Sequence, residues 1–341
     1  MEKGLVAVSG GVDSTNVLLE YKKQGICADG VIAKFHDMDI SAVSDAQNAA
    51  DKIGSKLFVL DLREEFENTV ISEFIDEYEN LRTPNPCITC NIKMKFGVLA
   101  DFAKKEGYDF FATGHYVRIE EENGEYFLKK AKDLKKDQSY VLWGIKKELL
   151  PYLRFPMGEV TKDEARENLL KEGLSNAKKK DSQDICFIPN GKYAEFIEGY
   201  TGKTFQNGEF VDLDGKVLGE HKGLIRYTIG QRKGLGLALP CPMYVTRLDR
   251  EKNQVILGLN GDLMSNRLTA KNVNWLSSKV YDGMSVLAKA RYAMRESPAV
   301  VRFLENNRIE VKFEESQRAI TSGQSVVLYD GDTVLGGGII E

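Results

Sequence analysis

The sequence contains few cysteines and few histidines, and neither type is spaced like a structural metal site. Of the 341 residues, five are cysteines and three are histidines. That is too few cysteines for a disulfide scaffold in a chain of this length, and no ligand spacing links the histidines. We therefore expect His36 and His221 to serve polar networks, Cys27 to lie in the core, and Cys241, between two prolines, to lie in a turn.

Long apolar runs are also absent from the sequence. No stretch approaches the ~18 continuous apolar residues of a membrane span, and the N-terminus lacks the apolar region and cleavage site of a secretory signal. We expect a cytoplasmic protein with no membrane partner and with reduced cysteines. The net charge of −4 argues weakly against nucleic acid. Basic clusters at 129–136, 178–180 and 222–233 could nevertheless track phosphates, although a solvated face is the simpler explanation for any one of them.

Strand and helix patterns alternate along the first half of the chain. Four apolar runs have the length of buried strands: 5–8, 30–35, 57–60 and 110–113. Four segments have the spacing of amphipathic helices: 14–22, 42–53, 66–78 and 92–105. The alternation predicts a parallel sheet with helices on both faces and a ligand site at the carboxyl ends of its strands.

The pattern changes after about residue 171. Five Asn-Gly or Asp-Gly pairs are hairpin-type turn signals: 207–208, 214–215, 260–261, 282–283 and 330–331. Short strand-like segments lie among them: 255–257, 285–290, 299–303, 309–313 and 325–328. We predict an α/β protein with a catalytic domain over 1–188, a central linking domain over 189–260 and an antiparallel β-barrel or sandwich over 261–341.

The hexapeptide Ser9-Gly10-Gly11-Val12-Asp13-Ser14 lies between the first predicted strand and the first predicted helix. Paired glycines let backbone amides approach an anion, and the helix start adds its positive end. Asp13 suits such a cradle only if it helps to hold Mg²⁺ or turns away from the phosphates. Because the Gly-Lys-Ser/Thr ending of the ordinary phosphate loop is missing, we do not expect γ-phosphoryl transfer.

This hexapeptide resembles the pyrophosphatase loop (PP-loop) of ATP enzymes that cleave between the α and β phosphates. Such enzymes activate an acceptor oxygen as its adenylate and release pyrophosphate. The resemblance indicates the chemistry and leaves the acceptor open.

Three further segments carry groups that narrow the acceptor. Residues 82–91 form a proline-punctuated loop with Cys87 and Cys90, and the helix start beyond it would lower a nearby thiol pKa. Residues 181–187 carry Cys186, and residues 221–236 are glycine-rich, basic and aromatic. Each segment alone could be structural, since a buried cysteine is more often inert than nucleophilic.

Together and in this order, the segments resemble the tRNA-specific 2-thiouridylases, and the resemblance extends through 112–116, 136–140 and 291–292. It implies a PP-loop domain of the adenine-nucleotide α-hydrolase type that uses ATP and Mg²⁺. The reaction it implies is adenylation of O2 of the wobble uridine, followed by attack of a persulfide sulfur and release of AMP. The implied partners are the anticodon arm of tRNA, whose base must flip out of its stack, and a persulfide donor protein.

The resemblance also assigns residues. It places the persulfide on Cys186, makes Cys90 the thiol that then forms a disulfide with it, and includes Asp13 in the catalytic set. The residues implied in ATP binding are Ala7, Val8, Ser9, Gly10, Gly11, Val12, Asp13, Ser14, Ala33 and Gly114. Those implied in tRNA binding are Asn85, Pro86, Cys87, Lys136, Asp137, Gln138, Arg291 and Tyr292.

Two positions depart from the family pattern. Cys87 stands where many members have an aspartate, whose carboxylate is a candidate acid–base group in those relatives. With Cys90 and Cys186 it gives three thiolates that could instead hold an iron–sulfur cluster with one open iron. The simpler alternative is a spare thiol or a second resolving residue. Ala33 replaces a methionine that relatives often place near the adenine.

Two functions of other kinds are compatible with parts of the sequence. A ligase for a small metabolite would explain the phosphate loop, but it would leave Cys90, Cys186 and the basic segment unexplained. A protein that only binds tRNA would explain the barrel and the basic clusters, but it would leave both thiols unexplained. ATP cleavage to AMP that depends on tRNA and a sulfur donor separates these functions.

Overall fold

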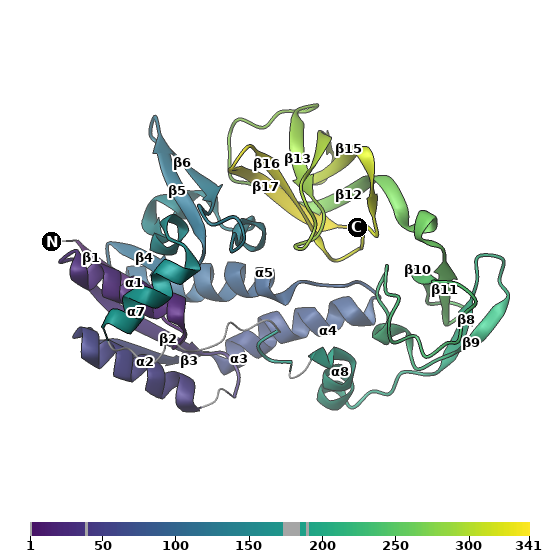
Figure 1. Ribbon diagram of the computed structural model, residues 1–341, viewed down its shortest axis with the longest axis horizontal. Helices are drawn as coiled ribbons and strands as arrows, with labels where there is room; N and C mark the ends of the chain where they lie inside the picture. Colours follow the sequence, from purple (N-terminus) through teal and green to yellow (C-terminus); the bar gives the residue numbers. More distant parts are fainter. Residues whose placement is uncertain (1, 38–39, 173–184, 189–190) are drawn as a thin grey trace.

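The computed structural model describes residues 2–37, 40–172, 185–188 and 191–341. Figure 1 shows the N-terminal region at the left, a central region at the right and a C-terminal barrel above both. The predicted basic cluster at 178–180 and residues 181–184 of the Cys186 segment lie outside the described residues.

A five-stranded parallel sheet forms the centre of the N-terminal region, with the strand order β3-β2-β1-β4-β7. Its strands are β1 (Lys3–Ala7), β2 (Cys27–Lys34), β3 (Leu57–Asp61), β4 (Phe110–Thr113) and β7 (Leu153–Arg154). Leu5 and Val6 of β1 pack into two different hydrophobic cores on the two faces of the sheet. Because both faces are buried, the strands are continuous apolar runs, and the predicted parallel sheet is confirmed.

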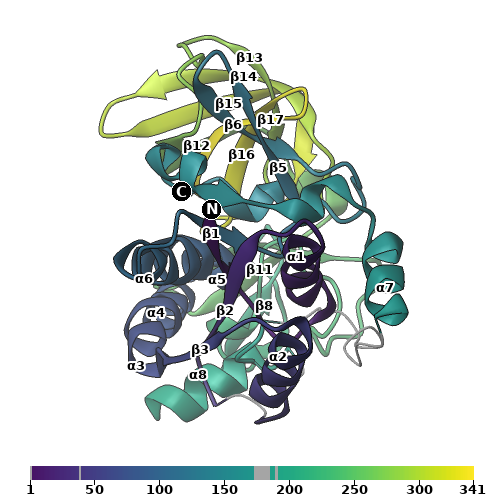
Figure 2. The ribbon, with the colours of Figure 1, turned by 90° about the vertical axis from the view of Figure 1, so that its left-hand side faces the viewer.

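Helices cover both faces of this sheet (Figure 2). One face carries α1 (Val12–Lys23), α2 (Ile40–Ile53) and α7 (Lys162–Lys171). The other carries two long helical stretches that each include a π-helical part. The first is α3 (Arg63–Phe66), Glu67–Ile71 and α4 (Ser72–Glu79); the second is α5 (Pro86–Cys90), Asn91–Leu99 and α6 (Ala100–Lys105). Short 3₁₀ helices occupy Ser139–Leu142, Lys147–Tyr152, Pro156–Glu159, Leu224–Arg226 and Asn260–Leu263.

The central region combines helix α8 (Tyr193–Thr201) with a four-stranded sheet in the order β10-β11-β8-β9. The strands are β8 (Gly208–Val211), β9 (Val217–His221), β10 (Tyr244–Asp249) and β11 (Gln254–Gly258). Asp214-Gly215 forms the β8–β9 turn, as predicted. The turn predicted at Asn207-Gly208 is wrong, because Gly208 begins β8. A Cβ there would lie 2.1 Å from the Asn253 carbonyl oxygen, so close backbone approach requires this glycine.

Six antiparallel strands close into the C-terminal barrel, in the order β12-β15-β14-β13-β16-β17 with β17 pairing back to β12. They are β12 (Met264–Trp275), β13 (Ser285–Lys289), β14 (Ser297–Leu304), β15 (Arg308–Arg318), β16 (Ser325–Asp330) and β17 (Thr333–Ile340). The predicted barrel is confirmed, and Asp330-Gly331 makes the β16–β17 turn. Asn260-Gly261 instead lies in a 3₁₀ helix, and Asp282-Gly283 forms a turn just before β13.

A hairpin from the N-terminal half joins this barrel. Strands β5 (Val117–Glu122) and β6 (Glu125–Lys130) extend the barrel sheet through the pairing of Lys129 with Thr333 of β17. The Lys130 ammonium contacts Glu296 at 2.5 Å and the Gly331 carbonyl oxygen at 2.9 Å. The β5–β6 hairpin and the C-terminal strands therefore share one sheet.

Three of the single-residue expectations can be compared with the structure. Cys27 is exposed, so its predicted core position is wrong: it occupies the first position of β2, before the buried part of that strand. Cys241 is exposed in a bend. His221 is buried in a polar network, with its Nε2–H donating to the Asn253 carbonyl at 3.1 Å and its Nδ1 accepting from Gly223 N–H at 3.1 Å. No helix in the described part of the chain is long and apolar enough to span a membrane.

Candidate active site

The Ser9–Ser14 loop lies at the carboxyl end of β1 and leads into α1, as the sequence predicted. Gly10 has φ +68°, and a Cβ there would lie 2.6 Å from the Ala42 carbonyl oxygen. The Ser9 amide donates to Ser14 Oγ at 3.0 Å, and the two hydroxyl oxygens are 3.2 Å apart. The tight turn leads into the start of the twelve-residue helix α1. The free amides and positive dipole at that helix start favour the binding of a phosphate.

Gly114 closes one side of this loop. It follows β4 directly, and a Cβ on it would lie 2.8 Å from the Ser14 amide nitrogen. Ala33 is buried near the end of β2, Ala7 ends β1, and Val8 follows it. The residues predicted to bind ATP therefore come together from the carboxyl ends of three neighbouring strands.

The carboxylate of Asp13 faces two residues that the sequence analysis did not identify. The Lys162 ammonium lies 2.7 Å from each of its oxygens, and the Tyr116 hydroxyl donates to Oδ1 at 2.6 Å. Lys162 is only 6% exposed. It is the first residue of α7, whose N-cap Thr161 forms a capping box with Glu164. A lysine at the N-terminus of a helix is unfavourable unless an anion lies nearby, because that end of the helix is already positive. The position of Lys162 directly after a capping residue was therefore the sequence signal that could have identified it as a partner of an acidic residue.

The first two thiols lie at the start of the second long helix. Asn85 caps it by accepting the Cys87 amide proton at 3.2 Å, and Pro86 occupies the first helical position. Cys87 is exposed and Cys90, one helical turn later, is buried. Asn85 and Pro86 thus fix the loop that presents Cys87.

Cys186 comes from a separate segment of the chain, residues 185–188, and lies in the same cluster. Phe187 anchors it by packing against Phe66 at 5.6 Å and Phe74 at 5.4 Å between ring centroids. Cys186 is exposed, yet it lies close enough to Cys90 for its charge to raise the pKa of the Cys90 thiol. The charge of Cys87 has the same effect on Cys90. The three thiols that the sequence singled out therefore share one electrostatic environment.

The surrounding protein desolvates these thiols. Desolvation raises the pKa of Cys87 and of Cys186, and it raises the pKa of Cys90 to about 12. The predicted lowering of a thiol pKa by the helix start is therefore wrong, because desolvation outweighs it. For all three thiols, the Lys95 ammonium acts in the opposite direction and lowers the pKa.

The arrangement of the thiols does not fit the iron–sulfur alternative. Within the described residues, no group of three His, Cys, Asp or Glu side chains is arranged to hold a metal ion. We therefore derive no step through a cluster at Cys87, Cys90 and Cys186.

Two separate segments predicted to bind tRNA meet near the thiols. The Tyr292 hydroxyl donates to the Asp137 carbonyl at 3.5 Å. The Asp137 carboxylate accepts from Ser139 Oγ at 2.6 Å, and Gln138 Oε1 accepts from the Tyr116 amide at 2.9 Å. Asp137 and Gln138 thus shape the loop with their side chains, while Lys136 is half-buried beside them.

The neighbouring Arg291 joins the barrel to the basic segment. Its Nη2 donates to the Ile229 carbonyl at 3.0 Å and also to Thr321 Oγ1. Tyr292 keeps 49% of its surface exposed. Burial raises the pKa of the Tyr292 phenol, and the charges of Asp137 and Cys87 raise it further. Tyr292 therefore lies close enough to Cys87 for their charges to interact.

The barrel also holds the proline loop directly, which the sequence did not predict. The Thr83 amide donates to the Ser322 carbonyl at 2.9 Å, and Gln324 Nε2 donates to the Thr83 carbonyl at 2.7 Å. Gly323 has φ +87°, and a Cβ on it would lie 2.8 Å from Thr83 N. We call these contacts the barrel latch (Thr83 with Ser322–Gln324).

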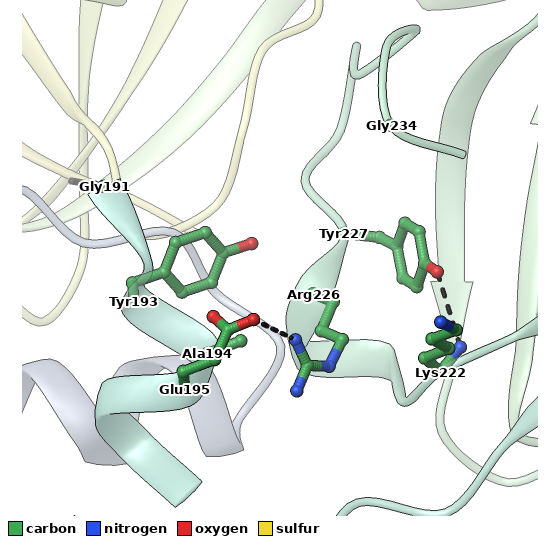
Figure 3. Close-up of a pocket in the computed structure, with 8 residues that line it drawn as sticks. All are labelled: Gly191, Tyr193, Ala194, Glu195, Lys222, Arg226, Tyr227 and Gly234. Atoms are coloured by element: carbon green, nitrogen blue, oxygen red, sulfur yellow. Dashed lines mark hydrogen bonds and ion pairs between the residues drawn. The ribbon is translucent and has the colours of Figure 1, made fainter. Parts of the chain in front are cut away.

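The predicted basic segment lines a pocket of about 270 Å³ against α8 (Figure 3). Tyr193 and Glu195 lie on one side, and Lys222, Arg226 and Tyr227 on the other. Arg226 is paired with Glu195 at 3.0 Å and with Glu198 at 2.6 Å. These carboxylates neutralise part of the basic character that the sequence suggested, and Lys222 remains exposed at the rim.

Comparisons with known proteins cover the whole chain. Three family models match it: a tRNA methyl transferase HUP domain over 2–190, a tRNA methyl transferase PRC-barrel domain over 194–259 and an aminomethyltransferase beta-barrel domain over 265–340. A tRNA-specific 2-thiouridylase MnmA of Clostridioides difficile (strain 630) is 43% identical over 100% of this chain and 98% of its own. One of Acetivibrio thermocellus is 44% identical over 100% and 99%.

A solved structure, the NMN synthetase from Francisella tularensis, matches 60% of this chain and 79% of that chain at 13% identity. Its TM-score of 0.34 is too low to support a structural comparison.

Proposed function

This chain belongs to the family of tRNA-specific 2-thiouridylases, and from that premise we propose that it catalyses the ATP-dependent 2-thiolation of the wobble uridine of tRNA. One observation carries the proposal. Gly114 lies against the end of the phosphate loop at Asp13 and Ser14, and the next residue, His115, contacts Lys95 on the helix of Cys87 and Cys90. The consecutive residues Gly114 and His115 therefore connect the phosphate loop to the helix that carries two of the thiols.

The phosphate loop would serve the first step. Backbone amides of Ser9–Ser14 and the start of α1 bind the phosphates of ATP while O2 of uridine attacks the α-phosphorus and pyrophosphate leaves. Asp13 and Ser14 are the residues that would hold Mg²⁺, which when bound neutralises the charge of the leaving pyrophosphate. Ala33 and Gly114 flank the nucleotide.

Cys186 and Cys90 would serve the second step. A donor protein supplies sulfur to Cys186 as a persulfide, whose terminal sulfur attacks C2 while the C2–oxygen bond to AMP breaks. The Cys90 thiolate then attacks Cys186 Sγ, the S–S bond of the persulfide breaks, and its electron pair completes the thiocarbonyl. The Cys90–Cys186 disulfide that remains requires a thiol reductant before the next turnover.

The tRNA would lie across all three domains, for which we propose the boundaries 1–188, 189–260 and 261–341. Asn85, Pro86 and Cys87 line the pocket of the flipped base, and Tyr292 faces that pocket from the barrel. Lys136, Asp137 and Gln138 would form a tRNA-contacting loop beside Tyr292. Arg291 would hold the adjoining part of the barrel against the basic segment through the Ile229 carbonyl. The proposed location is the cytoplasm, where tRNA and reduced thiols are both available.

Mass spectrometry of nucleosides tests this function. Unmodified tRNA is incubated anaerobically with the protein, ATP and Mg²⁺, once with a persulfide donor and once with sulfide. Thiouridine from the persulfide donor alone supports the Cys186 relay, whereas thiouridine from sulfide that depends on bound iron favours a cluster. No thiouridine under either condition, from folded protein that binds ATP, overturns the proposal and favours a ligase for a small metabolite.

A further inference from the structure

The thiol helix carries a cation whose presence the proposed roles do not explain. Lys95 is half-buried in the π-helical part Asn91–Leu99. Among the residues that the structure describes, no carboxylate is within ion-pair distance of its ammonium. A half-buried ammonium without a counter-ion is costly unless an anion joins it during function.

The geometry of the helix directs Lys95 toward the thiols. Hydrogen bonds in a π-helix run from i to i+5, so residues four and five positions apart lie on one side. Cys87, Asn91 and Lys95 are spaced four apart, and Cys90 precedes Lys95 by five. The π-helical turn therefore places the ammonium on the side of the helix that carries both cysteines.

His115 fixes this ammonium from the other direction. The Lys95 Nζ lies 3.5 Å from His115 Nε2, and His115 Nδ1 lies 2.7 Å from Thr113 Oγ1. Burial, together with the charge of Lys95, holds the pKa of His115 well below its usual value. The imidazole is therefore neutral: Nδ1–H donates to Thr113, and Nε2 accepts from Lys95. A neutral partner orients the ammonium and leaves its positive charge uncancelled.

The surroundings of the three thiols oppose the formation of a sulfur anion, so a nearby positive charge such as that of Lys95 is needed to stabilise one. Desolvation and the mutual repulsion of Cys87, Cys90 and Cys186 disfavour any sulfur anion. From the barrel, Tyr292 interacts electrostatically with Cys87, and Asp137 and Lys136 interact with Tyr292 in turn. The charge of Lys95 is the one cationic influence common to all three thiols of the described site.

We propose that Lys95 is a catalytic residue whose ammonium holds the reacting sulfur as an anion between the thiol cluster and the phosphate loop. This inference rests on the proposed function and adds an order of events to it. The ammonium first pairs with the terminal sulfur of the Cys186 persulfide. When that sulfur bonds to C2 and loses its charge as AMP leaves, the same ammonium is free to stabilise the Cys90 thiolate for the second attack.

The pH profile of thiol alkylation tests the proposal on the full-length protein, without tRNA or ATP. Rates of iodoacetamide labelling are measured at each cysteine by mass spectrometry for the wild type, Lys95→Gln, Lys95→Arg and Lys93→Met. In Lys95→Gln the profiles of Cys87 and Cys186 should move to higher pH, and a profile that moves by a full pH unit lowers the labelling rate at pH 8 about tenfold. Lys95→Arg keeps the charge and should retain the wild-type profile.

Two features of this design separate charge from structure. Glutamine can still donate to His115 Nε2, so Lys95→Gln removes the charge and keeps that contact. Lys93 is exposed on the same helix, and Lys93→Met should leave every profile unchanged. An unchanged profile in folded Lys95→Gln overturns the inference.

Failure of this inference is distinguishable from failure of the proposed function. If wild-type protein makes no thiouridine, the function fails whatever the alkylation profiles show. If wild-type protein makes thiouridine and Lys95→Gln labels like wild type, only the role of Lys95 is lost.

Discussion

The ammonium of Lys162 contacts both carboxylate oxygens of Asp13, each at 2.7 Å. The two residues are 149 positions apart, and their pairing ties α7 to the first turn of α1. Because Lys162 is buried, this contact fixes the aspartate of the phosphate loop before any nucleotide arrives. A metal ion that uses Asp13 must share this carboxylate with Lys162.

Replacing Lys162 with methionine should destabilise the protein and weaken ATP binding. The substitution leaves the Asp13 carboxylate, which is 29% exposed, without its cation, at a cost of about 2 kcal/mol. Urea unfolding should show the loss, and the double variant Asp13→Asn/Lys162→Met should recover most of it. Equal stability of the single and double variants would contradict the importance of the ion pair.

Gly114→Ala should weaken ATP binding at least tenfold while leaving the fold intact. Its Cβ would lie 2.8 Å from Ser14 N and 3.0 Å from Asp13 Cβ, which forces the phosphate loop away from β4. Isothermal titration with ATP measures the effect. Gly199→Ala is the control, because Gly199 lies in α8 with open space around its Cβ direction. That variant should bind ATP normally and be slightly more stable, since alanine favours a helix by ~1 kcal/mol over glycine.

Cys186→Ser should abolish thiouridine formation and leave the affinity for tRNA unchanged, because serine cannot carry a persulfide. Nucleoside mass spectrometry and filter binding measure the two properties. Cys241→Ser replaces an exposed cysteine in a bend and should retain activity. Lost tRNA binding in Cys186→Ser would identify a structural cysteine instead.

Stability should depend on pH through His115. Because its folded pKa lies well below its usual value, the unfolded chain binds the proton first as the pH falls below about 6.5. The free energy of unfolding therefore falls as the pH drops from about 6.5 to about 5, with a contribution from this group that approaches about 1.4 kcal/mol per pH unit at the acidic end. His115→Gln should lose less stability over that range. Parallel curves for wild type and variant would show that His115 does not carry the dependence.

Local patterns predicted much of the fold. The buried strand 110–113 reads as a continuous apolar run because helices cover both faces of the sheet. The run 57–60 also forms a strand, but as β3 it lies at the edge of the sheet, where Val59 is exposed. The Ser9–Ser14 loop was recognisable because six consecutive residues form the whole turn that is proposed to bind phosphate. The β5–β6 hairpin was missed although Asn123-Gly124, with φ +53° and +81°, is a hairpin signal.

The long-range contacts that complete the site could not be predicted from local sequence patterns. Lys162 reaches Asp13 across 149 positions, and Gln324 reaches Thr83 across 241. No periodicity encodes such pairs. The thiol pKa was predicted in the wrong direction for the same reason, because the helix start is local and the burial that outweighs it comes from the whole fold.

The barrel latch has a consequence for how the protein is made. Thr83 lies early in the chain, and its partners Ser322 and Gln324 lie near the end. A chain emerging from the ribosome can form the parallel sheet and the phosphate loop long before residues 322–324 exist. The loop that presents Cys87 therefore acquires its final shape only at the end of synthesis, and a nascent chain carries reactive thiols without an assembled active site.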